Sequence, residues 1–287
     1  MQAWTRPGPW RYEGKHFHYR HVNPWALPYQ KPHPPMWIPG TLSPETVQWC
    51  AEHRYPYIGL GTPLVPTCDL WDFYADEAAR HGYQAGPENF GYMIATVLAE
   101  TEEKAQALAE GFVYGGGQNA FSAPQYTMPP GYNSKTAIRI LAKQQTSAWL
   151  GISGEKVREQ MHGADTGAND YAEIRRKLHA ALLRGQQNMQ VIVGTPDTVI
   201  PKIKTIMNVL RIGIFIILSI QGPVADDDRR TSMRLFAQEV IPALKAHAKE
   251  IDLLDPFERI RGSVKLAPGT KRAPVVDREW LKGLGLK

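Results

Sequence analysis

Cysteine is scarce in this sequence of 287 residues, which contains Cys50 and Cys68 and no others. The two thiols are far apart and do not form a C-x-x-C spacing. Disulfide scaffolds and cysteine-based metal sites need several cysteines at short, regular spacings. The cysteine content therefore argues against both classes, and we expect two ordinary thiols in or near the core.

Long apolar stretches are also missing. The longest one, Ile212–Ile220, is interrupted by Gly213 and Ser219 and is far shorter than the roughly 20 residues of a membrane helix. It therefore predicts a buried strand. The N-terminus shows no basic region followed by an apolar one, so no signal peptide is visible. We expect a cytoplasmic protein that does not act in a membrane.

Charge of one sign is not concentrated anywhere in the chain. The net charge is +5, from 33 Lys and Arg against 28 Asp and Glu. Nucleic-acid binding would require basic residues on one face with aromatic residues between them, and the sequence does not show that pattern. Three histidines lie close together, at His16, His18 and His21, but an alternating strand would point them to different faces. We therefore expect no nucleic-acid partner and no metal site.

Short apolar strands alternate with helices from residue 36 to residue 252. The expected strands are Met36–Ile38, Tyr55–Leu60, Tyr92–Leu98 and Ile212–Ile220, and the expected helices are 43–53, 70–81, 100–114, 196–210 and 228–251. Residues 1–35 form an N-terminal arm with a strand or hairpin near 15–22. Residues 253–287 form a C-terminal extension with little periodicity.

The alternation is suspended between about residues 115 and 190, where a loop rich in Gly and Pro is followed by helical stretches near 134–150, 154–162 and 168–184. We expect a helical insertion there. Strand–helix alternation with apolar strands predicts an α/β fold with a parallel sheet. Four units are present, whereas a closed (β/α)8 barrel needs eight in about 250 residues. The fold class is therefore a partial TIM barrel, about strands five to eight, without the N-terminal half.

Four segments resemble, in order, the luciferase-like family of flavin-dependent monooxygenases. Residues 29–46 (YQKPHPPMWIPGTLSPET) resemble the P-x-Q-x-P-x-P-P segment that leads into the fifth strand of that family. Residues 97–105 (VLAETEEKA) resemble its segment after strand seven, 193–199 (VGTPDTV) a helix start, and 235–244 (LFAQEVIPAL) its last helix. Four collinear matches over roughly residues 20–250 identify the chain as similar to the C-terminal portion of this family.

The first segment also has a physical interpretation. A glycine turn followed by Ser43 and Pro44 at a helix N-terminus offers backbone N–H groups and the positive end of the helix dipole, which suits an anion. The alternative is that Ser43-Pro44-Glu45 only caps a helix. Gly194-Thr195-Pro196 has the same form, and there we favour the cap. Asp226-Asp227-Asp228 could bind a cation, but acidic residues that open a helix are the simpler interpretation.

The resemblance implies where a flavin binds. The family holds the flavin phosphate in the first loop, whose serine and threonine match Ser43 and Thr46. The next loop lies beside the isoalloxazine ring. The implied cofactor-binding residues are Gly40, Thr41, Leu42, Ser43, Thr46, Gly59, Gly61 and Thr62. We assign no catalytic residue, because the family draws most of its catalytic polar groups from strands with no counterpart here.

The resemblance implies a flavin-dependent oxidoreductase that oxygenates a small organic substrate with reduced FMN, with a flavin reductase as a possible partner. The chain alone is expected to be weakly active or inactive. Two alternatives remain: a deazaflavin-dependent reductase of the same superfamily, and a non-catalytic half-barrel that binds another chain. In either case a homo-oligomer or partner chain is expected to cover the exposed sheet edges. Substrate specificity is expected in the insertion, at Tyr126, Met128 and Tyr132.

Overall fold

The computed structural model describes residues 2–6, 8–41, 43–116, 171–219, 224–253 and 264–285. The chain divides into two compact units, residues Met1–Trp37 and Ile38–Lys287. Most of the expected insertion, with Tyr126, Met128 and Tyr132, lies outside the described residues, as does Leu42. Among the helices that the structure describes, none has both the length and the apolar character needed to cross a membrane.

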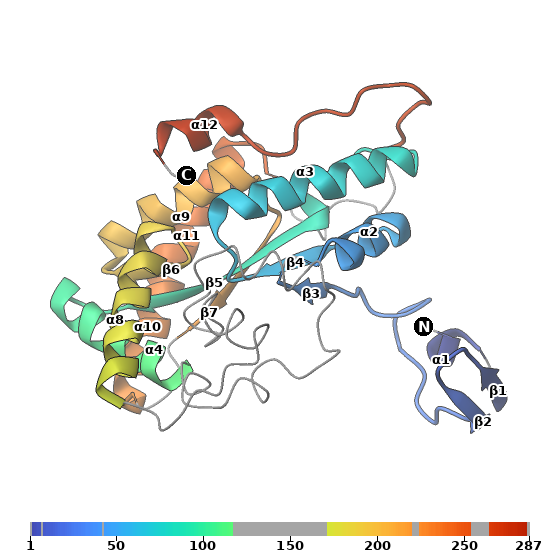
Figure 1. Cartoon of the computed structure of the whole chain (residues 1–287), viewed down its shortest axis with the longest axis horizontal. Helices are drawn as coiled ribbons and strands as arrows, with labels where there is room; N and C mark the ends of the chain where they lie inside the picture. Colours follow the sequence, from blue (N-terminus) through green and yellow to red (C-terminus); the bar gives the residue numbers. More distant parts are fainter. Residues whose placement is uncertain are drawn as a thin grey trace. The chain divides into compact units, whose positions relative to one another are not determined.

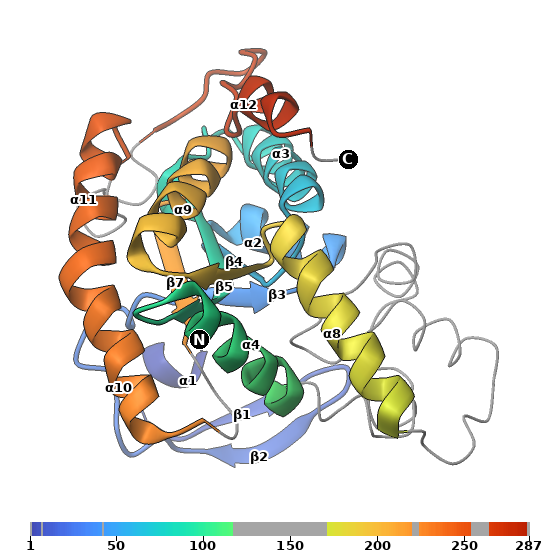
Figure 2. The same ribbon diagram turned by 90° about the vertical axis from the view of Figure 1, so that its left-hand side faces the viewer.

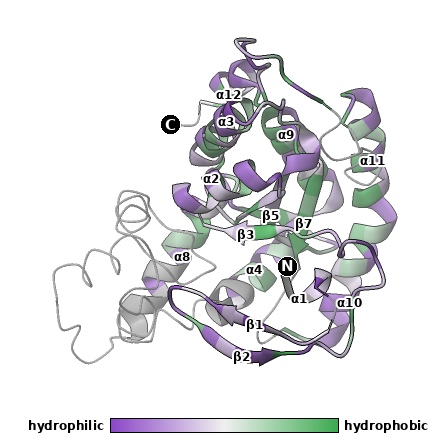
Figure 3. Cartoon of the chain, turned by 90° about the vertical axis from the view of Figure 1, so that its right-hand side faces the viewer, coloured by the Kyte–Doolittle hydropathy of each residue, from purple (hydrophilic) through white to green (hydrophobic). Residues whose placement is uncertain are grey.

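The first unit contains a helical turn and a β-hairpin. Helix α1 (Gln2–Thr5) precedes strands β1 (Trp10–Glu13) and β2 (His18–Val22), which pair in antiparallel fashion as the alternation over 15–22 predicts. The rings of Phe17 and Tyr19 stack with their centroids 6.3 Å apart. The hairpin is mostly hydrophilic in Figure 3, in contrast to the strands of the second unit.

The second unit is a parallel sheet with helical cover, the α/β fold that the alternation predicts (Figure 1). Its strands are β3 (Ile38–Gly40), β4 (Tyr57–Leu60), β5 (Phe90–Leu98), β6 (Val191–Gly194) and β7 (Ile214–Leu218). Its helices are α2 (Pro44–His53), α3 (Leu64–Arg80), η1 (Pro87–Asn89), α4 (Glu102–Gly116), α8 (Tyr171–Gln187), α9 (Pro196–Leu210), α10 (Asp226–Leu235), η4 (Phe236–Val240), α11 (Ile241–Glu250) and α12 (Arg278–Gly283).

Strand β5 pairs with three other strands. Residues 90–93 of β5 pair with β4, residues 91–95 with β7, and residues 95–98 with β6. A strand has only two edges, so β4 and β7, which share residues 91–93, lie on opposite edges of β5. Strands β6 and β7 share Ala95, so they too lie on opposite edges. Strand β6 therefore lies on the same edge as β4, beyond its carboxyl end.

Helices cover both faces of this sheet. Trp71 of α3 stacks on Phe90 with ring centroids 5.0 Å apart, whereas Ala95 and Val97, on the opposite face of β5, pack against α4 and α8. Figure 2 shows α3 and α9 on one side of the sheet and α4 on the other. Right-handed crossovers explain the arrangement. The chain crosses from β5 to β6 in one direction and from β6 to β7 in the other, so the connecting helices must lie on opposite faces.

The C-terminal residues from 264 onwards pack on α3 and α9. Asp72 of α3 forms ion pairs with both Arg272 (3.1 Å) and Arg278 (2.6 Å). Val275, Val276 and Leu281 of the same segment are buried. Helix α12 in this segment was not expected from the sequence, because its six residues are too few to show a helical period.

Three further differences from expectation have local causes. Helix α3 begins at Leu64 rather than 70, because Pro66 falls in its first turn, where proline is tolerated. Strand β6 was not expected, because its four residues follow the polar Gln190 and are too few to predict a strand from the sequence. The last helix was expected over 228–251 and is continuous over 226–250, but residues 236–240 form a π-helix just before Pro242, which cannot donate a backbone hydrogen bond.

The close packing of β5 against its neighbours predicts the effect of a methyl group at Gly91. A Cβ there would overlap Cδ1 of buried Ile58 and lie 3.2 Å from Cβ of Ile214. We expect Gly91→Ala to lower the free energy of unfolding by about 1–3 kcal/mol, as overpacked cores do. The measurement is the urea midpoint followed by circular dichroism.

Gly111→Ala is the matched control. Gly111 lies within helix α4, and a Cβ there would lie 3.6 Å from Cγ2 of Val224, an ordinary contact distance. There alanine should raise the free energy of unfolding by about 0.5–1 kcal/mol. Equal effects of the two substitutions would contradict the packing described for β5.

Candidate functional site

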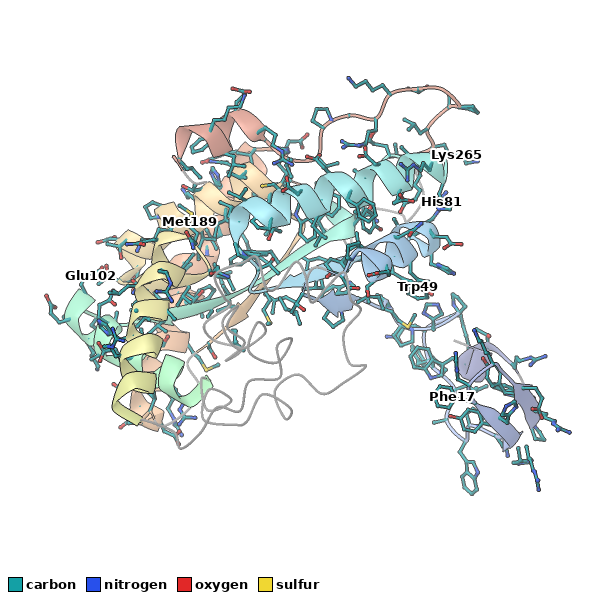
Figure 4. The ribbon with its side chains drawn as sticks, viewed as in Figure 1. Phe17, Trp49, His81, Glu102, Met189 and Lys265 are labelled. Atoms are coloured by element: carbon teal, nitrogen blue, oxygen red, sulfur yellow. The ribbon has the colours of Figure 1, made fainter. Side chains whose placement is uncertain are left out.

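The carboxyl ends of the strands bring the two loops implied by the resemblance next to each other. Strands β3 and β4 are parallel neighbours, and Gly40, the last residue of β3, pairs opposite Gly59 of β4. The chain then leaves β3 towards Ser43 and leaves β4 towards Thr62. In open α/β sheets, ligands bind outside the carboxyl ends of the strands. Figure 4 shows Glu102 beyond these ends, and His81 and Lys265 at the amino end.

Gly40 is required by the packing of its neighbour. A Cβ at this position would overlap the hydroxyl group of Tyr57, which is buried and meets Trp71 edge to face. The glycine therefore allows β3 and β4 to approach each other at the base of the first loop. This requirement is structural, and it fixes the level at which the chain turns towards α2.

Ser43 precedes α2 in an extended conformation, with Pro44 as the first helical residue. Its hydroxyl group donates a hydrogen bond to the carboxylate of Glu45 (2.9 Å) and does not cap the helix. Thr41, Ser43 and Thr46 are all half-buried. Three hydroxyl residues therefore lie at or beside the positive end of a ten-residue helix, and the Ser43 hydroxyl is bonded to the carboxylate of Glu45. This donor set suits an anion such as a phosphate.

The second loop is held by hydrogen bonds to residues of β5, to the residue before β6 and to α3. Gly61 has φ +56°, its N–H donates to the carbonyl of Met93 (2.8 Å), and its carbonyl accepts from Nε2 of Gln190 (3.2 Å). The carbonyl of Thr62 accepts from the hydroxyl of Tyr92. The hydroxyl of Thr62 is bonded to that of Thr67 (2.6 Å), and only 3% of the residue is exposed. Gly59 and Gly61 are also buried, whereas Leu60 is half-buried. Leu60 is thus the side chain that this loop presents.

Gln190 and Tyr92 were not expected from the sequence. Both side chains are buried, at 1% and 0% exposure, and each donates to a backbone carbonyl of the second loop. Burial raises the pKa of Tyr92 above its ordinary value, so the phenol remains a neutral donor. The available signal was Gln190 itself, a polar residue directly before the apolar run of β6.

The other helix N-terminus that could attract an anion is already filled. The carboxylate of Glu102, at the start of α4, accepts from the N–H of Thr195 (3.0 Å) and from the hydroxyl of Thr198 (2.7 Å) at the start of α9. A Cβ at Gly194 would lie 3.0 Å from both oxygens of this carboxylate. The segment 194–196 therefore starts a helix, as expected, but the Thr195 hydroxyl donates to Glu102 (3.0 Å) instead of capping the helix. The helix N-terminus thus receives its anion from within the chain.

The two cysteines and the three consecutive aspartates occupy structural positions. Burial raises the pKa of Cys50 and of Cys68 to about 12, so both remain protonated thiols. Asp226, Asp227 and Asp228 form the first turn of α10, as expected. In the part of the chain that the structure describes, no three His, Cys, Asp or Glu side chains are arranged to hold a metal ion.

The contacts of Glu102 predict a pH-dependent stability. The hydrogen bond from Thr198, followed by that from the Thr195 N–H, lowers the pKa of Glu102 below its ordinary value of 4.5. A carboxyl group with a lowered pKa stabilises the fold above pH 4.5, and the effect is lost as the pH falls through the lower value. We expect Glu102→Gln to lower the free energy of unfolding by about 0.5 kcal/mol near neutral pH, because solvent screens a partly exposed carboxylate, and by progressively less in acid. Thermal unfolding of both proteins at several pH values measures this.

Glu103→Gln is the control for this experiment, because Glu103 lies in the same helical turn and is exposed. It should change stability little at any pH. A Glu102→Gln effect that is constant from neutral to acid pH would contradict the role of the carboxylate at α9.

Comparison with known proteins agrees with this architecture. The family model for luciferase-like monooxygenases matches residues 1–210. Among solved structures, monooxygenase RslO1 from Streptomyces bottropensis is 18% identical with a TM-score of 0.51, over 85% of this chain and 58% of that one. The coenzyme F420-dependent tetrahydromethanopterin reductase from Methanopyrus kandleri is 20% identical with a TM-score of 0.51, over 84% and 59%. Riboflavin lyase RcaE, with modified FMN and riboflavin, is 17% identical with a TM-score of 0.51, over 97% and 53%.

These solved structures share the fold, and the chain spans between 53% and 59% of their lengths. The match of the family model extends over most of the sequence, from the first residue to the end of α9. The chain therefore belongs to the family of luciferase-like monooxygenases.

Proposed function

We propose that the chain binds FMN at the carboxyl ends of β3 and β4 and serves the oxygenation of a small organic substrate by reduced flavin. The observation that carries this proposal is the pairing of Gly40 with Gly59, which brings the two candidate loops side by side. The phosphate would be held at the start of α2 by the hydroxyl groups of Ser43 and Thr46. When bound, the flavin supplies the redox chemistry, and the protein orients it.

An apolar surface next to these loops suits a flat ring. Leu60, Met93 and Leu218 are half-buried and pack at the border of the cluster formed with α4 and α8. Leu60 and Met93 are paired neighbours on β4 and β5. Ligand pockets combine such apolar surfaces with a few polar groups that fix orientation. The isoalloxazine ring would therefore lie beside residues 59–62, with Leu60 as its contact.

We further propose that β3, β4, β5 and β7 correspond to strands five to eight of a (β/α)8 barrel. Four strands are half of the number that a closed barrel needs. Groups that act on the substrate would then come largely from the other half, and this chain alone would turn over substrate slowly or not at all. A flavin reductase would supply the reduced cofactor.

A deazaflavin-dependent reductase is the second candidate, because one structure with the same fold depends on coenzyme F420. The two candidates differ in the cofactor that the first loop must accept. Titration of the purified chain with FMN, riboflavin and F420, followed by fluorescence, separates them. Binding of F420 alone would contradict the FMN proposal, and binding of no flavin would contradict both.

The phosphate loop gives a specific prediction. We expect the double variant Ser43→Ala, Thr46→Val to weaken FMN binding about tenfold through the loss of hydrogen bonds to a charged group. Riboflavin, which lacks the phosphate, should bind unchanged. Glu45→Gln should strengthen FMN binding, because it removes the carboxylate that now accepts the Ser43 hydroxyl.

The control for the loop variants is Thr205→Val on α9, where the hydroxyl donates to the carbonyl of Pro201 in its own helix. Its dissociation constants for FMN and riboflavin should equal those of the unmodified protein. Equal loss of FMN and riboflavin affinity in the loop variant would place the phosphate elsewhere.

We also propose that a second copy or another chain covers the sheet edges. Among the described residues, β3 pairs only with β4 and β7 only with β5, and four of the five apolar residues of β7 are half-buried. Unpaired apolar edges favour association. Sedimentation velocity of the purified chain should show a species larger than 32.2 kDa. A stable monomer at micromolar concentration would be evidence against this partner.

A further inference from the structure

Two buried side chains fix the loop that follows β4. Nε2 of Gln190 donates to the carbonyl of Gly61 (3.2 Å), and the hydroxyl of Tyr92 donates to the carbonyl of Thr62. These carbonyls belong to the two residues directly after Leu60. Because Gly61 has a positive φ, the chain turns sharply here, and both turned carbonyls point into the protein. The orientation of Leu60 therefore depends on two donors that lie far from it in sequence.

Gln190 connects this loop to the far side of the sheet. Its backbone N–H donates to the carbonyl of Gly185 in α8 (2.8 Å), and β6 begins at the next residue. Since β6 continues the edge of β5 on which β4 ends, the side chain of Gln190 meets the chain as it leaves β4. Tyr92 reaches the same loop from the middle of the sheet.

We infer that Gln190 and Tyr92 are positioning residues that hold residues 59–62 against the flavin ring and have no part in holding the phosphate. This inference rests on the proposed function. It divides the site into two parts with separate supports. The phosphate part depends on the start of α2, and the ring part depends on donors from β5 and from the residue before β6.

The substitutions Gln190→Leu and Tyr92→Phe test the ring part. Each leaves one buried carbonyl of the loop without its donor, which allows the loop to shift. We expect each variant to raise the dissociation constants for riboflavin and for FMN by the same factor, about tenfold, so that the ratio of the two constants stays unchanged. The absorption band of bound flavin should also shift, since the ring environment changes.

Tyr83→Phe is the matched control. The Tyr83 hydroxyl is buried, donates to the carbonyl of Ala51 (2.7 Å) and lies 3.2 Å from the hydroxyl of Tyr74. This variant therefore also removes one buried hydroxyl donor from a backbone carbonyl. Tyr83 precedes β5 and lies at the amino end of the strands. Tyr83→Phe should lose thermal stability to a similar extent but bind riboflavin and FMN as the unmodified protein does. A purely structural role of Tyr92 would make the two phenylalanine variants alike in flavin binding.

Gln190→Glu adds a pH profile that a general loss of stability does not produce. A protonated glutamic acid can donate to the Gly61 carbonyl, whereas a carboxylate is repelled by it. Riboflavin affinity of this variant should therefore be close to normal at about pH 5 and fall towards about pH 9, because burial favours the protonated acid. The unmodified protein should not show this fall. Unfolding at each pH confirms that the variant is folded.

The outcomes separate the inference from the proposed function. If the unmodified chain binds neither riboflavin nor FMN, the proposed function fails. If it binds both, and folded Gln190→Leu and Tyr92→Phe bind riboflavin with unchanged affinity, only the inference fails. A selective loss of FMN in these variants would also overturn it, because the residues would then support the phosphate part.

Discussion

The pairing of β5 with three strands is the constraint on which the rest of the second unit depends. The first half of this strand pairs with β4 and β7, and its second half extends beyond β4 to meet β6. The extension brings Gln190 to the carboxyl end of β4. It also reverses the direction of the crossovers, so α4 and α8 lie on one face and α3 and α9 on the other. Without the last four residues of β5, neither arrangement could form.

The N-termini of α2 and α9, which follow the carboxyl ends of β3 and β6, show how similar sequence patterns acquire different roles. Ser43-Pro44-Glu45 and Thr195-Pro196-Asp197 both place a hydroxyl residue before a proline that opens a helix. At α9 an internal carboxylate occupies the site and is bonded by Thr195 and Thr198. At α2 a carboxylate of the helix itself, that of Glu45, accepts from Ser43. The site at α9 is thus complete within the chain, whereas the site at α2 has hydroxyl groups suited to a ligand.

Local signals predicted much of the fold. The starts of α2 and α9 follow from cap and proline residues, and β4, β5 and β7 follow from apolar runs, because such signals act within a few residues. Strand β6 was missed because only its pairing with β5 makes four residues a strand. The loops of the candidate site could be named from the family resemblance, and Ser43 and Thr46 remain predictions. Their supports could not be named, since Gln190 and Gly61 are 129 residues apart and only the fold brings them together.

The sequence of strand β7 affects the risk that newly made chains aggregate before they fold. Its five residues, Ile-Phe-Ile-Ile-Leu, are apolar and β-prone, with no proline or charge among them. Apolar segments of high β-propensity without proline or charge are prone to stack with identical copies when they are exposed before folding. Two processes therefore compete for this strand. It can pair with β5 of the same molecule, or it can stack with the same strand of other copies. The first process does not depend on concentration and the second does, so the yield of folded protein should fall as the rate of synthesis rises.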